Sequence, residues 1–397
     1  MKLLYVHDHY FMTHRSGAVY SASGSFPAAI WARYLSAFAS ITVVGRDGGQ
    51  CDDTPSSRVL SSAQRVDFCL MQNMSTFNAL VGVNKAIRAQ IAELVRTHHA
   101  IILRLPSRYG ELVAREARRQ NRSYAVEMVG CAFESYYNYG TLLGKLVAPF
   151  AYLSTRYFTV RAEAVLYVTQ FFLQQRYPTK AQMTTFCANV ELDAVDAAVL
   201  QTRLARIAAA RGVPIAIGLI GHFMADYKGV DTAIRMLATL RVAGCNCELH
   251  IVGRGEPAPY LALAKQLAVA EYTHFLGVLP GAKAIAPWLD SMDYYIQPSR
   301  IEGLPRALVE AMSRGLPAVA SRVGGIPELL KCDYLAAKED VAGLSERLLV
   351  LMRDSKATAQ AAQDNFIHAQ SYEKSRLDKR RTAFWQAYAA SLKQGGS

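Results

Sequence analysis

The sequence predicts an α/β protein built from two doubly wound, Rossmann-like domains that face each other across a cleft. Three observations lead to this fold class. The chain has 397 residues, enough for two domains that each bury a full core. Short apolar segments alternate with helical segments, a pattern typical of parallel sheets covered on both faces. The alternation stops at the sequence Arg211-Gly212-Val213-Pro214 and then restarts, which marks a domain boundary.

The first half contains short apolar strands separated by helices. Strands are expected at 3–6, 41–44, 67–70, 100–104, 124–129, 165–169 and 183–186. Helices are expected from Pro27 to Phe38, at 78–97 and at 110–119, followed by a polar, alanine-rich helix at 193–211. We expect these strands to form one parallel sheet with helices on both faces.

The second half repeats the alternation more regularly. Strands are expected at 215–220, 248–252, 273–276, 294–297 and 318–321, with helices at 229–243, 257–269, 282–290 and 305–314. A last amphipathic segment at 373–392 is expected to pack across both domains. We therefore predict an N-terminal domain at 1–205, a C-terminal domain at 206–372 and a C-terminal helix at 373–397. In such a pair the ligand lies at the carboxyl ends of the strands, between the domains.

Composition excludes several classes of protein. A hydrophobic fraction of 51% and a charged fraction of 19% are typical of a compact protein, not a disordered one. No stretch approaches the roughly 18 uninterrupted apolar residues of a membrane span. The first apolar run, residues 2–6, is too short for a signal-peptide core. We expect a cytoplasmic protein, either soluble or peripheral on the inner face of the plasma membrane.

The seven cysteines are scattered and odd in number, which favours a reducing compartment over a disulfide framework. Cys245 and Cys247 form an isolated C-x-C pair with no second pair and no suitably spaced histidines. No metal site is expected.

The net charge of +12 indicates an anionic partner. Nucleic acid is not expected, because no recognition module is present. Residues 101–161 hold nine Lys or Arg against four Glu, interleaved with aromatic residues. That pattern fits an anionic membrane surface. The alternative is that these aromatic residues are ordinary core residues of amphipathic helices.

The segment from Ser299 to Met312 carries the strongest chemical signal. Glu302 and Glu310 lie eight residues apart. Between them Gly303 allows a bare backbone turn, and Pro305 is a residue that favours the start of a helix. Backbone amides of such a helix start bind phosphate oxygens, which leaves the two carboxylates free for sugar hydroxyls. The alternative is an exposed acidic residue beside a capping glutamate.

Three further loops of the second half follow expected strands. Gly221 and His222 precede Lys228, which could neutralise a diphosphate at a helix start. Arg254 lies in a Gly-Arg-Gly turn, and Val278 and Leu279 expose backbone groups that could contact a nucleotide base. A solvated lysine at a helix N-terminus is the alternative for Lys228, although the helix dipole disfavours it.

Four of these stretches, spanning about 110 residues in order and spacing, resemble the nucleotide-sugar-binding domain of the family 4 retaining glycosyltransferases. They are Gly221-His222 to Lys228-Gly229, Val252-Gly-Arg-Gly255, Glu302-Gly-Leu-Pro-Arg to Glu310, and Gly315-Leu-Pro to Val-Gly-Gly-Ile-Pro-Glu328. The resemblance implies the GT-B architecture. It also implies a metal-independent transfer of a hexose or N-acetylhexosamine, with retention, from a UDP- or GDP-linked sugar.

The resemblance assigns roles to individual positions. Lys228 would hold the diphosphate, Glu302 the transferred sugar and Glu310 the ribose. His222 occupies the position of the family's arginine and would be a weaker, pH-sensitive contact. The remaining candidates are the donor-facing Gly221, Arg254, Val278, Leu279, Gly303, Leu304, Pro305 and Arg306 and, in the first half, Glu127 and Gly24. Glu127 could equally be a structural hydrogen-bond partner.

The function that the resemblance favours is that of a transferase with a glycan or lipid-linked acceptor, active in cell-surface polysaccharide or glycolipid synthesis. No cofactor is expected apart from the donor itself. Three alternatives remain: a soluble transferase acting on a small acceptor, a sugar-nucleotide epimerase of similar architecture, and a binding module without catalysis.

Overall fold

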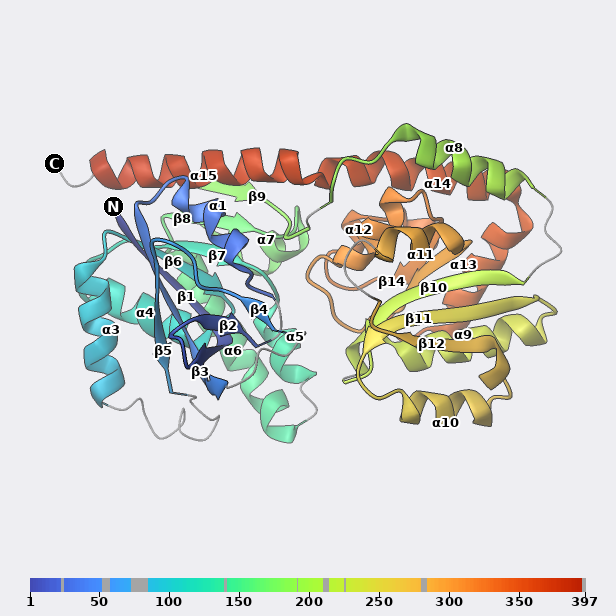
Figure 1. Cartoon of the computed structure of the whole chain (residues 1–397), viewed down its shortest axis with the longest axis horizontal. Helices are drawn as coiled ribbons and strands as arrows, with labels where there is room; N and C mark the ends of the chain where they lie inside the picture. The colour runs from blue at the N-terminus through green and yellow to red at the C-terminus, as the bar shows by residue number, and fades with distance from the viewer. Residues whose placement is uncertain are drawn as a thin grey trace. The chain divides into compact units, whose positions relative to one another are not determined.

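The computed structural model describes residues 1–22, 25–51, 58–72, 85–138, 141–190, 192–209, 214–224, 226–279 and 284–394. The chain divides into two compact units (Figure 1). The first unit comprises Met1–Cys187 with Asp378–Ser397, and the second comprises Ala188–Leu377. Each contains a largely parallel sheet with helices packed on it, so the predicted α/β class is confirmed.

The sheet of the first unit is parallel at its centre and has an antiparallel edge. Its parallel part runs in the order β5-β3-β1-β6-β7-β8-β9, and the short strands β2 and β4 extend it beside β1. The strands are β1 (Lys2–His14), β2 (Val19–Ser21), β3 (Ser40–Cys51), β4 (Val59–Leu60), β5 (Val66–Met71), β6 (Ala100–Leu105), β7 (Ala125–Met128), β8 (Ala164–Tyr167) and β9 (Met183–Phe186). The strands β2 and β4 were not predicted, because each is too short to show an alternating pattern.

The helices of the first unit are α1 (Ala32–Leu35), α3 (Lys85–Thr97), α4 (Arg108–Arg119), α5 (Ala132–Tyr137), α6 (Leu142–Val160), α7 (Phe172–Arg176) and part of α15 (Lys374–Gln394). The helix expected from Pro27 to Phe38 is instead a 3-10 turn, η1 (Ala28–Trp31), followed by the single turn α1. Its Trp31 and Tyr34 are buried, and this aromatic packing holds the segment. Residues 78–84 of the expected second helix lie outside the described residues.

The second unit has the cleaner topology. Its described strands are parallel and lie in the order β12-β11-β10-β13-β14-β15. They are β10 (Ile215–His222), β11 (Cys247–Arg254), β12 (Thr273–Gly277), β13 (Tyr294–Gln297), β14 (Ala318–Ser321) and β15 (Leu335–Ala336). The α-helices are α8 (Ala197–Ala208), α9 (Val230–Val242), α10 (Ala258–Gln266), α11 (Ile285–Ser291), α12 (Arg306–Ser313), α13 (Val341–Arg353) and α14 (Ser355–Ala369).

One face of this sheet forms a core with α9, α10 and α13, in which Ile217, Leu249 and Ile251 are fully buried. Cys247 belongs to the same core and is a free thiol.

The boundary between the units lies earlier than the sequence analysis placed it. The chain enters the second unit after Cys187, and not near residue 205. The reason is α8: the Arg203 side chain is buried and donates hydrogen bonds to the carbonyls of Leu289 (3.1 Å) and Arg314 (3.2 Å) within the second unit.

The last helix also changes units. Residues from Asp378 onward belong to the first unit. There Trp385 and Tyr388 are fully buried, and the Tyr388 hydroxyl donates to the Ile101 carbonyl at 3.2 Å. Among the described helices, none is long and apolar enough to cross a membrane.

Candidate functional site

The predicted donor-holding residues of the second unit lie on loops that follow β10 and β13. β10 ends at His222, a 3-10 turn (Asp226–Lys228) follows, and Gly229 starts α9. β13 ends at Gln297, and α12 begins after Pro305. The strands are parallel neighbours, so both loops emerge at the same edge of the sheet.

Lys228 and Glu302 form the centre of this site. The Lys228 ammonium lies 2.7 Å from Glu302 Oε1. The same oxygen accepts hydrogen bonds from Ser299 Oγ at 2.8 Å and from Gln297 Nε2 at 3.2 Å. Gln297 and Ser299 are fully buried, and the Tyr295 hydroxyl donates to Gln297 Oε1 at 2.9 Å. Glu302 is therefore held in one orientation by a buried polar chain.

Arg300 fixes the two loops relative to each other. Its guanidinium donates two hydrogen bonds to Asp231, at 2.9 and 2.7 Å, and one to Glu339 at 2.6 Å. Its backbone amide donates to the Tyr227 carbonyl at 2.7 Å. Such a bidentate pair restrains geometry as well as adding energy. Arg300 thus sets the position of Lys228 against Glu302.

Two glycines permit a close approach of backbones around Glu302. Gly229 has φ +68°, and a Cβ there would lie 2.0 Å from the Pro298 carbonyl oxygen. Gly324 has φ +54°, and a Cβ there would lie 1.9 Å from the Glu302 carbonyl oxygen. Any other residue would push these loops apart.

Glu310 lies in the second turn of α12 and is half-buried. Burial raises the pKa of its carboxyl group, with Arg306 acting in the opposite direction. No side chain caps the N-terminus of α12, and in the described part of the chain the Glu310 carboxylate makes no hydrogen bond. A free carboxylate and uncapped backbone amides can both accept a polar ligand.

His222 lies beside Lys228 as a neutral ring. Burial and then the Lys228 charge lower its pKa. Its ring packs edge-on against Tyr227 with centroids 4.5 Å apart, and its buried Nδ1 has no hydrogen-bond partner among the described residues. Near neutral pH the ring therefore offers a hydrogen bond and not a cation.

The remaining candidate residues differ in where they lie and in how exposed they are. Arg254 aligns with His222 in the register of β10 and β11, and its side chain is exposed. Arg306 is exposed at the first position of α12, next to the partly buried Gly303 and Leu304. Val278, which is 63% exposed, and Leu279 follow β12 at the edge of the sheet. Gly24 lies outside the described residues.

Glu127, the candidate of the first unit, is 1% exposed and has both oxygens occupied. Oε1 lies 2.6 Å from Arg104 Nη1, and Oε2 accepts from the Tyr34 hydroxyl at 2.6 Å. Burial alone would raise the pKa of Glu127, but Arg104 and Tyr34 outweigh it and the pKa lies below its ordinary value. This geometry favours the structural alternative.

The basic, aromatic stretch contains an exposed apolar stripe, which we call the α6 stripe. It comprises Leu142, Leu146, Phe150, Leu153 and Tyr157, which are 81, 69, 72, 60 and 41% exposed. Their spacing of three or four residues places them on one face of the helix.

Basic side chains border the stripe. Arg118 and Arg161 lie over the Tyr157 ring, at 5.1 and 3.6 Å from its centroid, and Lys145 is exposed between the leucines. Of the aromatic residues that the sequence analysis considered, Phe158 is a core residue and Phe133 and Tyr152 pack against the core. Leucines form most of the stripe, and the pattern of basic and aromatic residues in the sequence did not indicate them.

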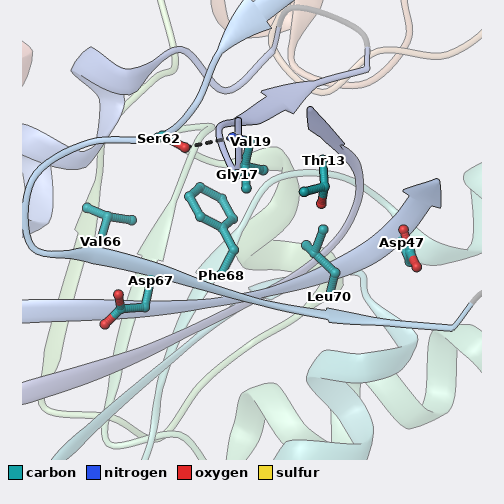
Figure 2. A pocket seen from close by; sticks show the side chains of 9 residues that line it. All are labelled: Thr13, Gly17, Val19, Asp47, Ser62, Val66, Asp67, Phe68 and Leu70. Carbon is teal, nitrogen blue, oxygen red and sulfur yellow. Dashed lines mark hydrogen bonds between the residues drawn. The ribbon is translucent and has the colours of Figure 1, made fainter. Parts of the chain in front are cut away.

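A pocket of about 430 Å³ lies in the first unit, lined by Thr13, Gly17, Val19, Asp47, Ser62, Val66, Asp67, Phe68 and Leu70. Figure 2 shows Phe68 in the middle of the lining, with Asp67 and Asp47 toward opposite ends. The Val19 amide donates to Ser62 Oγ at 2.7 Å and closes one side. Of the predicted donor-holding residues that the structure describes, none lines this pocket.

The sequence analysis did not identify the residues that hold Glu302 and the two loops in place. Gln297, Ser299 and Tyr295 fix Glu302, and Arg300 fixes both loops. A polar Gln-Pro-Ser-Arg sequence directly after an apolar strand was the available signal, since buried strand ends carry polar residues only where partners satisfy them.

Comparison with known proteins identifies the second unit. Residues 214–354 match the family described as "Glycosyl transferases group 1". Over 351 residues the chain is 30% identical to Protein CapJ of Staphylococcus aureus, covering 87% of this chain and 85% of that protein. It is 31% identical over 135 residues to the putative colanic acid biosynthesis glycosyltransferase WcaL of Escherichia coli strain K12, covering 32% of this chain and 33% of WcaL.

Among solved structures, the chain resembles HepE of Anabaena in complex with UDP-glucose. The TM-score is 0.63 at 15% identity, with 98% of this chain and 100% of that chain covered. At this identity the likeness shows the fold, which is that of the GT-B glycosyltransferases.

Proposed function

The chain belongs to the group 1 glycosyl transferases, and we propose that it is a retaining enzyme of family 4. Its donor would be a nucleotide diphosphate sugar and its acceptor a glycan or a lipid-linked sugar. The observation that carries this proposal is the geometry around Lys228, Glu302 and Glu310. One ion pair, one free carboxylate and one uncapped helix N-terminus meet at neighbouring strand ends.

The donor would bind through groups of opposite character. The diphosphate needs positive charge, which Lys228 and the first amides of α12 supply. Sugar hydroxyls need acceptors, and Glu310 and the second oxygen of Glu302 supply them. Because Lys228 is already paired with Glu302, a bound diphosphate would share the ammonium with that carboxylate. The ion pair would therefore hold the sugar-binding carboxylate of Glu302 next to the diphosphate-binding ammonium of Lys228.

Catalysis would be electrostatic. Charge develops on the leaving diphosphate, and preorganised donors that meet it there stabilise the transition state. Lys228 and the α12 amides would fill that role, and we propose that no metal is needed. A departing phosphate oxygen would accept the proton of the incoming hydroxyl on the same face of the sugar, so that no protein nucleophile is needed. His222 would donate one hydrogen bond to the diphosphate.

Two observations support an acceptor at the cytoplasmic membrane surface. The α6 stripe exposes leucine and phenylalanine beside exposed cations, the combination that binds anionic lipid surfaces. WcaL carries a name from colanic acid biosynthesis, which favours a polysaccharide or glycolipid product. We therefore propose a peripheral enzyme of cell-surface polysaccharide or glycolipid synthesis.

A donor screen tests the proposal. Purified protein is incubated with UDP-, GDP- and ADP-sugars, with EDTA and with lipid extract as the acceptor source, and free nucleoside diphosphate is measured. We expect release with one donor class, abolished in Lys228→Ala, and a product whose anomeric configuration by NMR matches the donor. A new sugar nucleotide without diphosphate release would indicate an epimerase, and donor binding without turnover a binding module. An inverted product would overturn retention.

A further inference from the structure

Three side chains on the second unit's sheet converge at a point away from the donor-holding loops. Glu248 and His250 lie two residues apart on β11 and therefore point to the same face. His274, on β12, is the direct partner of His250 in the parallel register. One nitrogen or oxygen atom of each lies within 4.8 Å of the other two.

The distances fit a shared ion. Glu248 Oε2 lies 2.8 Å from His274 Nε2 and 3.7 Å from His250 Nε2. In a tetrahedral zinc site each ligand atom is about 2.0–2.2 Å from the metal, which places the ligand atoms roughly 3.4 Å from one another. The two observed separations lie on either side of that value. Small rotations of the side chains would bring all three atoms onto one metal.

Hydrogen bonding alone leaves the cluster incomplete. Glu248 can accept a hydrogen bond from His274, but 3.7 Å is too long for a second one from His250. No other hydrogen bond to the His250 ring is found within the described ranges. Its ring instead stacks on His274 with centroids 4.6 Å apart and planes 27° apart. Two imidazoles thus crowd one carboxylate, although only one of them bonds to it.

We propose that Glu248, His250 and His274 form a binding site for a divalent transition metal of the zinc class. Two imidazoles and one carboxylate suit Zn²⁺, whereas Mg²⁺ and Ca²⁺ prefer sites made of oxygen atoms. The side chains of Glu248, His250 and His274 are 28, 22 and 36% exposed. Water can therefore reach a fourth coordination position.

The metal would clamp an edge strand. β12 has five residues, is the last strand of its sheet and pairs with β11 through an irregular register after Ile251. Short edge strands of this kind are weakly held. His250 precedes Arg254 by four residues, roughly 13 Å along the strand, so the site is separate from the donor loops. Its role is structural, and it does not depend on the proposed transfer reaction.

Metal titration of the full chain tests the site. The protein is dialysed against EDTA and then titrated with ZnCl₂ by calorimetry and with CoCl₂ by visible absorption. We expect one equivalent of Zn²⁺ per chain, Co²⁺ bands characteristic of low coordination number, and a higher melting temperature with Zn²⁺. His274→Gln keeps a hydrogen-bond donor for Glu248 but removes the imidazole, so it should weaken Zn²⁺ binding at least tenfold, the lower end of the effect of outer-sphere changes.

Two controls make the result decisive. His99→Ala removes an exposed histidine of the first unit and should leave Zn²⁺ affinity and the thermal shift unchanged. His250→Ala should reproduce the loss seen with His274→Gln, because each removes one ligand. Absence of stoichiometric Zn²⁺ binding by the native chain would overturn the proposal. Equal affinity in the native chain and His274→Gln would also overturn it, by locating the ion elsewhere.

Discussion

The carboxylates on and beside the strands of the two units differ in how completely their oxygens are hydrogen-bonded. In the first unit, Asp8 accepts from Ser107 Oγ, two backbone amides of α4 and Arg46. Glu127 is likewise enclosed by Arg104 and Tyr34. In the second unit, Glu310 is unbonded within the described residues and Glu302 uses one oxygen for every bond described.

This contrast separates scaffold from site. A buried charge whose bonds are all internal has nothing left for a ligand, and removing its partner costs stability. A half-buried carboxylate without a partner costs stability by its presence and is retained where it binds something. A carboxylate on or beside a strand therefore does not by itself indicate function. Function is indicated by carboxylate oxygens that accept no hydrogen bond from within the protein.

The largest expected effect is the loss of stability in Glu127→Ala. The change leaves Arg104 buried without its partner, which costs about 3–5 kcal/mol. Glu310→Ala removes a carboxylate whose pKa burial already raises, so its unfolding free energy should change by less than about 1 kcal/mol. Hydrogen exchange followed by mass spectrometry reads each unit separately. Equal loss of protection in both variants would break the comparison.

Lys228→Ala should lower turnover roughly a hundredfold or more, the usual effect of removing a donor that stabilises a leaving group. The fold should survive, because Ser299 and Gln297 still hold Glu302. Turnover is measured with the donor that the screen identifies. Lys265→Ala, an exposed lysine on α10, is the matched control and should retain full activity. Comparable turnover in the two variants would remove Lys228 from the site.

Leu146→Asp should weaken binding to vesicles of anionic phospholipid by roughly tenfold or more, since a buried leucine contributes about 1.5–3 kcal/mol. Ile367→Asp is the control: Ile367 is 62% exposed on α14, close to the 69% of Leu146. Flotation and melting temperature are measured for both. The α6 stripe would lose its assigned role if both variants floated as the native chain does.

The sequence predicted strands β10 to β14 of the second unit because they are short, apolar and regularly separated by helices, but it did not predict β15, α13 or α14. It also singled out Lys228, Glu302 and Glu310 as candidates, since glycine and proline mark the surrounding turns. The first unit was harder. Arg104 and Glu127 lie 23 residues apart, and only pairing of β6 with β7 brings them together.

The proposed metal site shows the same limit. His250 and His274 have no motif spacing, because their proximity depends on the register of β11 and β12. The α6 stripe was overlooked for a different reason. The helix buries Ala148, Thr155 and Phe158 and exposes leucines, which reverses the usual expectation that leucine marks the core.

Stability should fall as the solution is acidified, through His7 of the first unit. Burial, with Arg104 next, lowers its pKa from 6.5 to about 3. Between these pH values the unfolded chain binds a proton at His7 that the folded chain does not bind. The free energy of unfolding is therefore unaffected by His7 above pH 6.5 and decreases as the pH falls below it. Between pH 7.5 and 5.5 the cost is about 1.4 kcal/mol. The free energy of unfolding of the native chain and of His7→Asn, which cannot titrate, is measured by urea unfolding at several pH values. It should fall more steeply with decreasing pH in the native chain. Equal pH dependence in the two proteins would contradict the prediction.

The smallest expected effect is a gain in donor affinity in His222→Arg. The neutral ring next to Lys228 would be replaced by a permanent cation facing the diphosphate, worth about 0.5–1 kcal/mol, or roughly two- to fivefold in KM for the donor. In the native enzyme, KM should also fall as the pH drops toward the lowered pKa of His222, because protonation supplies the missing charge. The arginine variant should lack that pH dependence. A variant with weaker donor binding at every pH would show that His222 serves through its packing on Tyr227 and not through its proton.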